Sequence, residues 1–188
     1  MAARINAEPV DSTYEDSARW LAASLIWLVA GFAFPFLAPA TASLSAGLTR
    51  YLSTAAGMDE ELAFRVAFTI FRLPLAAFLA IGVAAVQGVL LRSIRPVIRR
   101  WLFAAAIGAS IATLIYLPSG LLAIQIAGDP LSDVVNLLLL VPGAGMHAGL
   151  VSILQRRAGR RKVFVPGRFI VISILAAALG AFIGFKAS

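Results

Sequence analysis

His147 is the only histidine in the chain, and it lies among glycine and alanine in the apolar segment VPGAGMHAGLVSIL, residues 141–154. An unpartnered imidazole in lipid costs several kcal/mol, so this ring must meet a hydrogen-bonding group or a metal ion. We expect a packed histidine that hydrogen-bonds a neighbouring helix. The competing hypothesis is an axial ligand to the metal of a tetrapyrrole, for which Gly143, one helical turn earlier, leaves room.

Other catalytic patterns are missing from the sequence. A Ser-His-Asp triad would have to use His147, and no G-x-S-x-G, phosphate-binding glycine loop or HExxH motif is present. Cysteine is absent, which excludes disulfides and thiolate ligands. Long stretches on both sides of Asp133 lack carboxylates, so a metal site has few ligands to draw on. We therefore expect a protein that is not an enzyme and holds no metal ion.

Two charged residues, Arg72 and Asp133, stand near the same boundary of the apolar segments. We predict an ion pair or close polar contact between them at the outer face. Asp133, Asn136 and His147 share a helical stripe, which Pro142 interrupts. The stripe is either an outer polar cap plus one interhelical hydrogen bond, which we expect, or part of a conduction path.

Composition places these residues in a membrane. The chain is 61% hydrophobic and 13% charged, whereas a soluble domain is roughly half apolar and a quarter charged. Its apolar residues fall into blocks of about twenty, the length of helix that crosses a hydrocarbon core about 30 Å thick. The sequence therefore predicts an all-α fold, a polytopic membrane helical bundle with about five transmembrane helices and short interfacial helices.

The expected organisation is a polar cytoplasmic tail over residues 1–19 and a single transmembrane domain over residues 20–188. Pro35 and Pro39 should kink or end the first span, before a short interfacial helix, and Pro74 should break the next apolar run. Arg72 should extend its guanidinium to water at that break. The predicted spans are about 20–39, 72–91, 101–120, 131–155 and 169–185, and residues 121–130 should lie at the surface or dip in and out of the membrane.

Basic residues predict the orientation. Ten of the sixteen Lys and Arg lie in two short connections, after the second and fourth spans: Arg92, Arg95, Arg99, Arg100, Arg156, Arg157, Arg160, Arg161, Lys162 and Arg168. The positive-inside rule makes both connections cytoplasmic. The N-terminus is then inside and the C-terminus outside, in a bacterial inner membrane. Anionic lipid headgroups are the expected partners of these side chains, and nucleic acid is not.

Small residues predict where helices approach closely. Gly145 and Gly149 form a GxxxG pair beside Gly143, and Gly180 and Gly184 form a second pair in the last span. Such pairs allow van der Waals contact between backbones, which holds helices together in lipid. We expect these glycines to pack against other helices, within this chain or in other membrane subunits.

The sequence also contains an internal repeat of a helical hairpin, with similar segments at residues 80–92 and 144–156, each followed by a basic turn and a glycine-bearing span. In its pattern Ala80, Ala84, Gln87, Leu91, Arg92 the chain resembles bacterial multi-pass membrane proteins of unassigned function with tandem small-x3-small-x2-Gln hairpins running into Leu-Arg. The second copy departs from the pattern, because Val151 stands where glutamine is expected.

A second resemblance concerns the pigment hypothesis. Gly143-x3-His147 is similar to the small-x3-His arrangement of bacteriochlorophyll-binding antenna helices, which implies bacteriochlorophyll, with carotenoid or bound lipid, as the cofactors to consider. The function that we expect is a non-catalytic integral membrane subunit that packs against and stabilises a larger complex, such as a photosynthetic or respiratory one. The alternative is a small homo-oligomeric transporter or channel.

Overall fold

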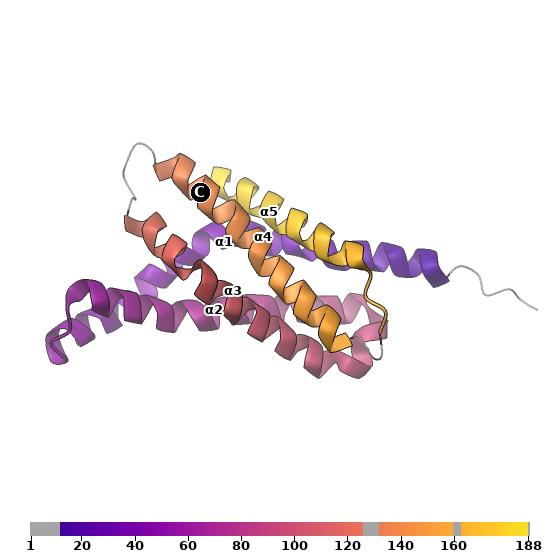
Figure 1. The fold of residues 1–188 in the computed structure, drawn as a ribbon, viewed down its shortest axis with the longest axis horizontal. Helices are drawn as coiled ribbons and strands as arrows, with labels where there is room; N and C mark the ends of the chain where they lie inside the picture. Colours follow the sequence, from indigo (N-terminus) through magenta and orange to yellow (C-terminus); the bar gives the residue numbers. More distant parts are fainter. Residues whose placement is uncertain (1–11, 126–131, 160–162, 188) are drawn as a thin grey trace, which may run out of the picture.

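The computed structural model describes residues 12–125, 132–159 and 163–187. These residues form α1 (Ser12–Ala55), α2 (Glu60–Leu90), the short 3-10 helix η1 (Arg92–Val97), α3 (Ile98–Gln125), α4 (Ser132–Gly159) and α5 (Gly167–Ala187) (Figure 1). Five of the helices are long and apolar enough to cross a membrane. The predicted all-α, polytopic bundle is therefore confirmed.

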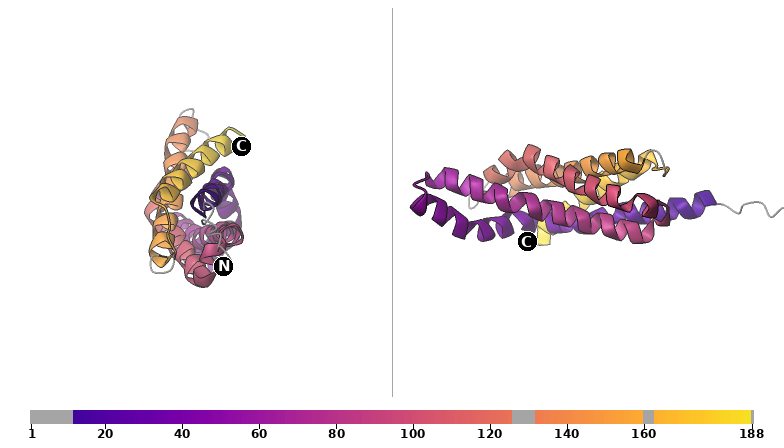
Figure 2. Two further views of the ribbon diagram at one scale, coloured as in Figure 1. Left: turned by 90° about the vertical axis from the view of Figure 1, so that its right-hand side faces the viewer. Right: turned by 90° about the horizontal axis from the view of Figure 1, so that it is seen from below.

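The helices form a closed ring. Each packs against its neighbours in the chain, and α5 packs against α1 to complete the circle (Figure 2). The α2–α3 and α4–α5 connections lie at the same end, here called the basic end, as Figure 1 shows. The α1–α2 turn lies at the opposite end. Both arginine-rich connections therefore face one side, the arrangement that the positive-inside rule requires of two such connections.

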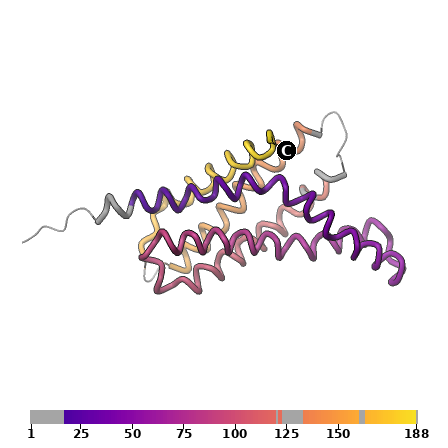
Figure 3. The backbone as a smooth tube through the Cα atoms, turned by 180° about the vertical axis from the view of Figure 1, so that it is seen from behind, coloured from indigo at the N-terminus to yellow at the C-terminus, as the bar shows by residue number. Residues whose placement is uncertain are grey.

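α1 differs from its prediction, because it continues as one helix through Pro35 and Pro39 to Ala55. Transmembrane helices tolerate proline when side chains and neighbouring helices satisfy the freed backbone groups. The prolines kink α1, which is one of the two outcomes expected, and the bend is visible in Figure 3.

α2 also runs unbroken, through Pro74, so the predicted break at residue 72 was wrong. Asp59 caps its first turn by accepting from the backbone N–H groups of Glu61 and Leu62 at 3.0 and 3.2 Å. Acidic residues in the first turn also favour the helix dipole. The helix therefore begins at Glu60 and includes the segment that we expected to be a separate interfacial helix.

The remaining boundaries lie close to the predicted ones. α1 begins at Ser12, so residues 12–19 of the predicted polar tail are helical. α3 extends past Pro118 to Gln125, so half of the predicted surface segment is helical. Residues 126–131, the rest of that segment, and residues 1–11 of the predicted tail lie outside the described residues.

Glycines close the ring between α1 and α5. A Cβ at Gly180 would overlap the backbone of Leu28, and one at Gly184 would overlap the backbone of Phe32. From the other side, a Cβ at Gly31 would overlap the backbone of Ala177. The two helices therefore touch backbone to backbone, which only residues without a side chain allow.

Candidate functional site

His147 lies on α4 with 6% of its surface exposed. Its Nδ1 is 2.8 Å from the carbonyl oxygen of Gly143, and its Nε2 is 3.1 Å from the hydroxyl oxygen of Thr113 on α3. A carbonyl only accepts, so in the neutral ring Nδ1 carries the proton and Nε2 accepts from Thr113. Both nitrogens have partners within the chain.

Aromatic rings surround His147. The Phe34 ring of α1 lies edge-on at 5.0 Å between centroids, and the Tyr116 ring of α3 lies edge-on at 6.2 Å. A Cβ at Gly143 would come within 2.5 Å of the Tyr116 ring. The small residue one turn before His147 therefore makes room for an aromatic ring of the same chain. An axial ligand role would require Nε2 to lose its bond to Thr113.

The four other glycines proposed for packing lie at two helix contacts. Gly180 and Gly184 face α1, as described above. Gly145 and Gly149 face Ile174 of α5, whose side chain would be 3.4 and 3.1 Å from a Cβ at these two positions. These contacts are ordinary or only slightly tight. The Gly145–Gly149 surface is therefore covered by α5 of the same chain, which leaves less room there for a helix of another subunit.

Arg72 is buried, with 4% of its surface exposed, although we predicted that it would reach water. Its guanidinium carbon lies 5.4 Å from the centroid of the Phe34 ring. Asp133, its predicted partner, is exposed on α4, and among the described side chains no ion pair joins the two. Stacking on an aromatic ring has taken the place of the predicted contact, because a guanidinium is weakly hydrated and planar.

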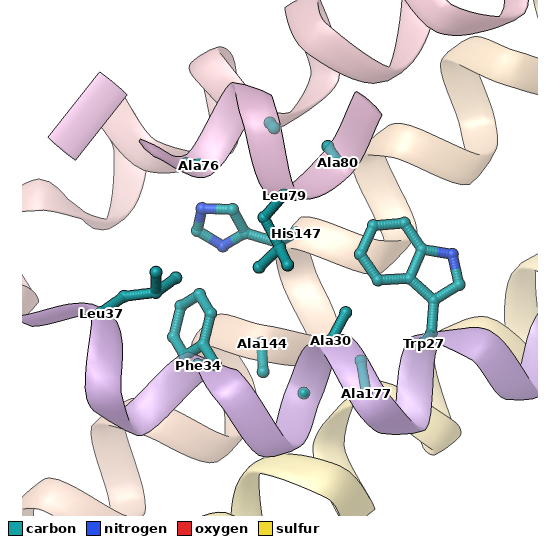
Figure 4. A pocket seen from close by; sticks show the side chains of 12 residues that line it. Trp27, Ala30, Phe34, Leu37, Ala76, Leu79, Ala80, Ala144, His147 and Ala177 are labelled. Carbon is teal, nitrogen blue, oxygen red and sulfur yellow. The ribbon is translucent and has the colours of Figure 1, made fainter. Parts of the chain in front are cut away.

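A cavity lies beside Phe34 and His147, with lining residues from all five long helices (Figure 4). Its free volume is about 20 Å³, which is room for about one water molecule. Phe34 and His147 form part of its wall, together with the small or apolar residues Ala76, Leu79 and Ala144.

A second polar cluster, which sequence reasoning missed, lies nearer the basic end. The Gln87 Oε1 atom accepts from Trp101 Nε1 at 3.2 Å and from Gln155 Nε2 at 3.1 Å. Gln87 in turn donates to the carbonyl oxygen of Ala23 at 3.1 Å. These four residues come from α2, α3, α4 and α1. The signal in the sequence was a glutamine in each repeated segment, Gln87 in residues 80–92 and Gln155 in residues 144–156. Counted from the start of its own segment, Gln155 comes about one helical turn later than Gln87.

The described residues of the basic connections are exposed at one end: Arg92, Arg95, Arg99, Arg100, Arg156, Arg157 and Arg168. Arg160, Arg161 and Lys162 lie outside the described residues. Arg168 donates to the hydroxyl of Ser17 at 2.6 Å, which ties the start of α5 to α1. Within the described ranges, no group of three or more His, Cys, Asp or Glu side chains is placed to hold a metal ion.

Comparisons of this chain with protein-family models, with curated proteins and with solved structures found no match. Its resemblance to tandem-hairpin membrane proteins stays a prediction.

Proposed function

We propose that the chain is a non-catalytic integral membrane subunit that packs against a larger complex, in a bacterial inner membrane with its N-terminus in the cytoplasm. The observation that carries this proposal is the length of the α1–α2 hairpin. α1 has 44 residues and α2 has 31, whereas about 20 residues cross a hydrocarbon core. The hairpin extends past the ends of the other helices (Figures 1 and 2).

Apolar side chains are exposed on this extension. Leu44 and Tyr51 of α1, and Leu62 and Ile70 of α2, each leave about half or more of their surface uncovered. Counting twenty residues from Trp20 along α1 ends at Pro39, so Leu44 and Tyr51 lie beyond a core-spanning length. Large apolar surface outside the hydrocarbon marks an interaction site. A neighbouring subunit that covers the hairpin would remove these apolar side chains from water.

The test is to purify the protein in mild detergent and to record its native mass and absorption spectrum. We expect a complex larger than the 19.8 kDa chain that contains other subunits. Leu44→Ala with Tyr51→Ala should release them. Phe103→Ala with Leu175→Ala is the matched control, because these side chains, on α3 and α5, are exposed to a similar extent as Leu44 and Tyr51. Equal effects of the two pairs would contradict a docking role for the hairpin.

One observation favours the alternative, a small homo-oligomeric transporter or channel. Polar side chains of α2, α3 and α4, among them Arg72, Thr113 and His147, are buried inside the bundle, and such groups mark ion pathways in membrane proteins. A native mass that is a multiple of the mass of this chain, together with ion flux into liposomes, would favour the transporter or channel. A complex with other proteins, without ion flux, would favour the role as a subunit.

A further inference from the structure

A groove lies between α1 and α5 at the basic end of the bundle, although the two helices touch further along. Both helices begin at this end and pack side by side (Figure 1). Backbone contact occurs around Gly31 and Gly180, whereas nearer the basic end the rings of Trp20 and Phe169 meet edge-on, 5.1 Å apart between centroids. Large side chains hold helix backbones further apart than glycine does. The space beside these two rings is the groove.

The groove has a polar part and an apolar part. Its volume is about 380 Å³, which falls in the range of small-molecule sites. Arg168 and Ser17 line it nearest the basic end, and the Nη2 atom of Arg168 donates to the Ser17 hydroxyl at 2.6 Å. Leu21 and Ile172, about one helical turn further along, line it with apolar surface. A cation, a hydroxyl and apolar walls thus belong to one space.

The guanidinium of Arg168 has capacity for an anion. It is exposed, and a guanidinium carries five N–H donors in a planar fork, of which the bond to Ser17 uses one. Among the described side chains, no ion pair joins Arg168 to a carboxylate. An anionic group in the groove therefore gains charge-assisted hydrogen bonds without breaking an ion pair of the described chain.

The depth of the groove matches the boundary between lipid headgroups and hydrocarbon. Trp20 and Phe169 are the first residues of the predicted first and fifth spans, and aromatic rings are frequent at this level of a membrane. Arg168 precedes the fifth span, so its charge lies at the level of the headgroups. Beyond the groove the apolar surface continues with Leu25 and Leu175, which are both exposed. The surface is therefore first cationic and then apolar, which complements a phospholipid whose headgroup lies at the basic end.

We propose that this groove binds one anionic phospholipid from the leaflet at the basic end. Its phosphate accepts hydrogen bonds from Arg168, and an acyl chain lies along Leu21 and Ile172. An anionic headgroup is favoured over a zwitterionic one, whose ammonium group would stand near the guanidinium and repel it. The lipid contacts α1 and α5 together and strengthens their contact where large rings hold the backbones apart. This site is independent of the proposed subunit role, because it lies at the opposite end of the bundle from the α1–α2 turn.

The experiment is native mass spectrometry of the detergent-purified protein, with phosphatidylglycerol and phosphatidylcholine of equal chain length added in competition. We expect one phosphatidylglycerol molecule per chain to be held more tightly than phosphatidylcholine. Arg168→Gln should lower its apparent affinity about tenfold, as expected when charge-assisted hydrogen bonds are lost, and Arg168→Lys should retain more of it because the charge remains. Arg92→Gln, which removes an exposed arginine of the other basic connection, should bind like the wild type.

A second variant keeps the test decisive if Arg168→Gln does not fold. Ala18 lines the groove and is exposed, so Ala18→Phe should fill the groove and reduce the retention of phosphatidylglycerol. Ala85→Phe, at an exposed alanine of α2, is its control and should not.

Three outcomes would overturn the proposal. The first is equal retention of the two lipids by the wild type, or retention that neither Arg168→Gln nor Ala18→Phe changes. The second is displacement of phosphatidylglycerol by inorganic phosphate at equal concentration, which would assign Arg168 to a free anion. The third is a photoreactive residue in place of Ala18 that crosslinks to another protein and not to lipid, which would assign the groove to a subunit contact.

Discussion

The side-chain amides of Gln87 and Gln155 are hydrogen-bonded at 3.1 Å, although the two residues are 68 positions apart and belong to α2 and α4. The same Gln87 oxygen also accepts from Trp101, and the Gln87 amide nitrogen bonds to the backbone of α1. One side chain therefore links four helices. In lipid, where no water competes, such a group specifies which helix faces meet.

The first prediction concerns this cluster. Gln87→Leu should destabilise the bundle by about 1–3 kcal/mol, because it leaves the donors of Trp101 and Gln155 buried without an acceptor. Gln155→Leu removes only one of these bonds and should cost about 1 kcal/mol. Unfolding of the purified protein in mixed detergent micelles measures both. Equal losses for the two variants would show that Gln87 is not the centre of the cluster.

The second prediction concerns the contact between α1 and α5. Gly180→Ala should destabilise the protein by about 1–3 kcal/mol, because the new Cβ meets the Leu28 backbone and forces the helices apart. Gly82→Ala is the control, since nothing lies within 4 Å of a Cβ there. It should be neutral or stabilising by up to about 1 kcal/mol. A harmless Gly180→Ala would contradict the close backbone approach.

The third prediction concerns His147. We expect the absorption spectrum of the purified protein to be unchanged by His147→Ala, because both ring nitrogens are engaged by Gly143 and Thr113. A double-mutant cycle with Thr113→Val should give a coupling of about 0.6–2 kcal/mol, the range of interhelical hydrogen bonds in membranes. Loss or shift of a pigment band in His147→Ala would show instead that the ring binds a tetrapyrrole.

The fourth prediction concerns orientation. Reporter fusions at Ala158, beside the arginine-rich α4–α5 connection, should be active in the cytoplasm, and fusions at Asp129 should be active outside. Asp129 itself lies outside the described residues, but the described end of α3 and the described start of α4 both lie at the end of the bundle opposite the basic one. The same sidedness at both positions would refute the topology.

The number and approximate place of the five helices could be predicted because hydrophobic length depends on local composition. The continuity of α1 and α2 could not. A proline or arginine in an apolar run indicates a break only if nothing satisfies the freed backbone or the charge. Here α1 continues through both of its prolines because it packs between α2 and α5, and the Arg72 guanidinium stacks on the Phe34 ring. Such partners come from neighbouring turns and helices, which a linear pattern does not reveal.

The polar contacts show the same limit. The sequence predicted that His147 would find a partner, since its burial cost is a local property. It did not name Thr113 or Phe34, because these lie on other helices and their rotation about the helix axis is set by packing. The pairing of Arg72 with Asp133 was expected from matching depth and opposite charge. Depth alone does not bring two side chains to the same face.

The contact of Gly31 and Gly180 with each other's helices has a consequence for biosynthesis. The two glycines are separated by most of the chain, and a ribosome adds about 5–20 residues per second. The first helix therefore waits on the order of 10 seconds in the membrane before the last one is made. During that time the surface of α1 around Gly31 lacks the α5 backbone that covers it in the finished bundle. The ring of helices can close only after the fifth helix has been made.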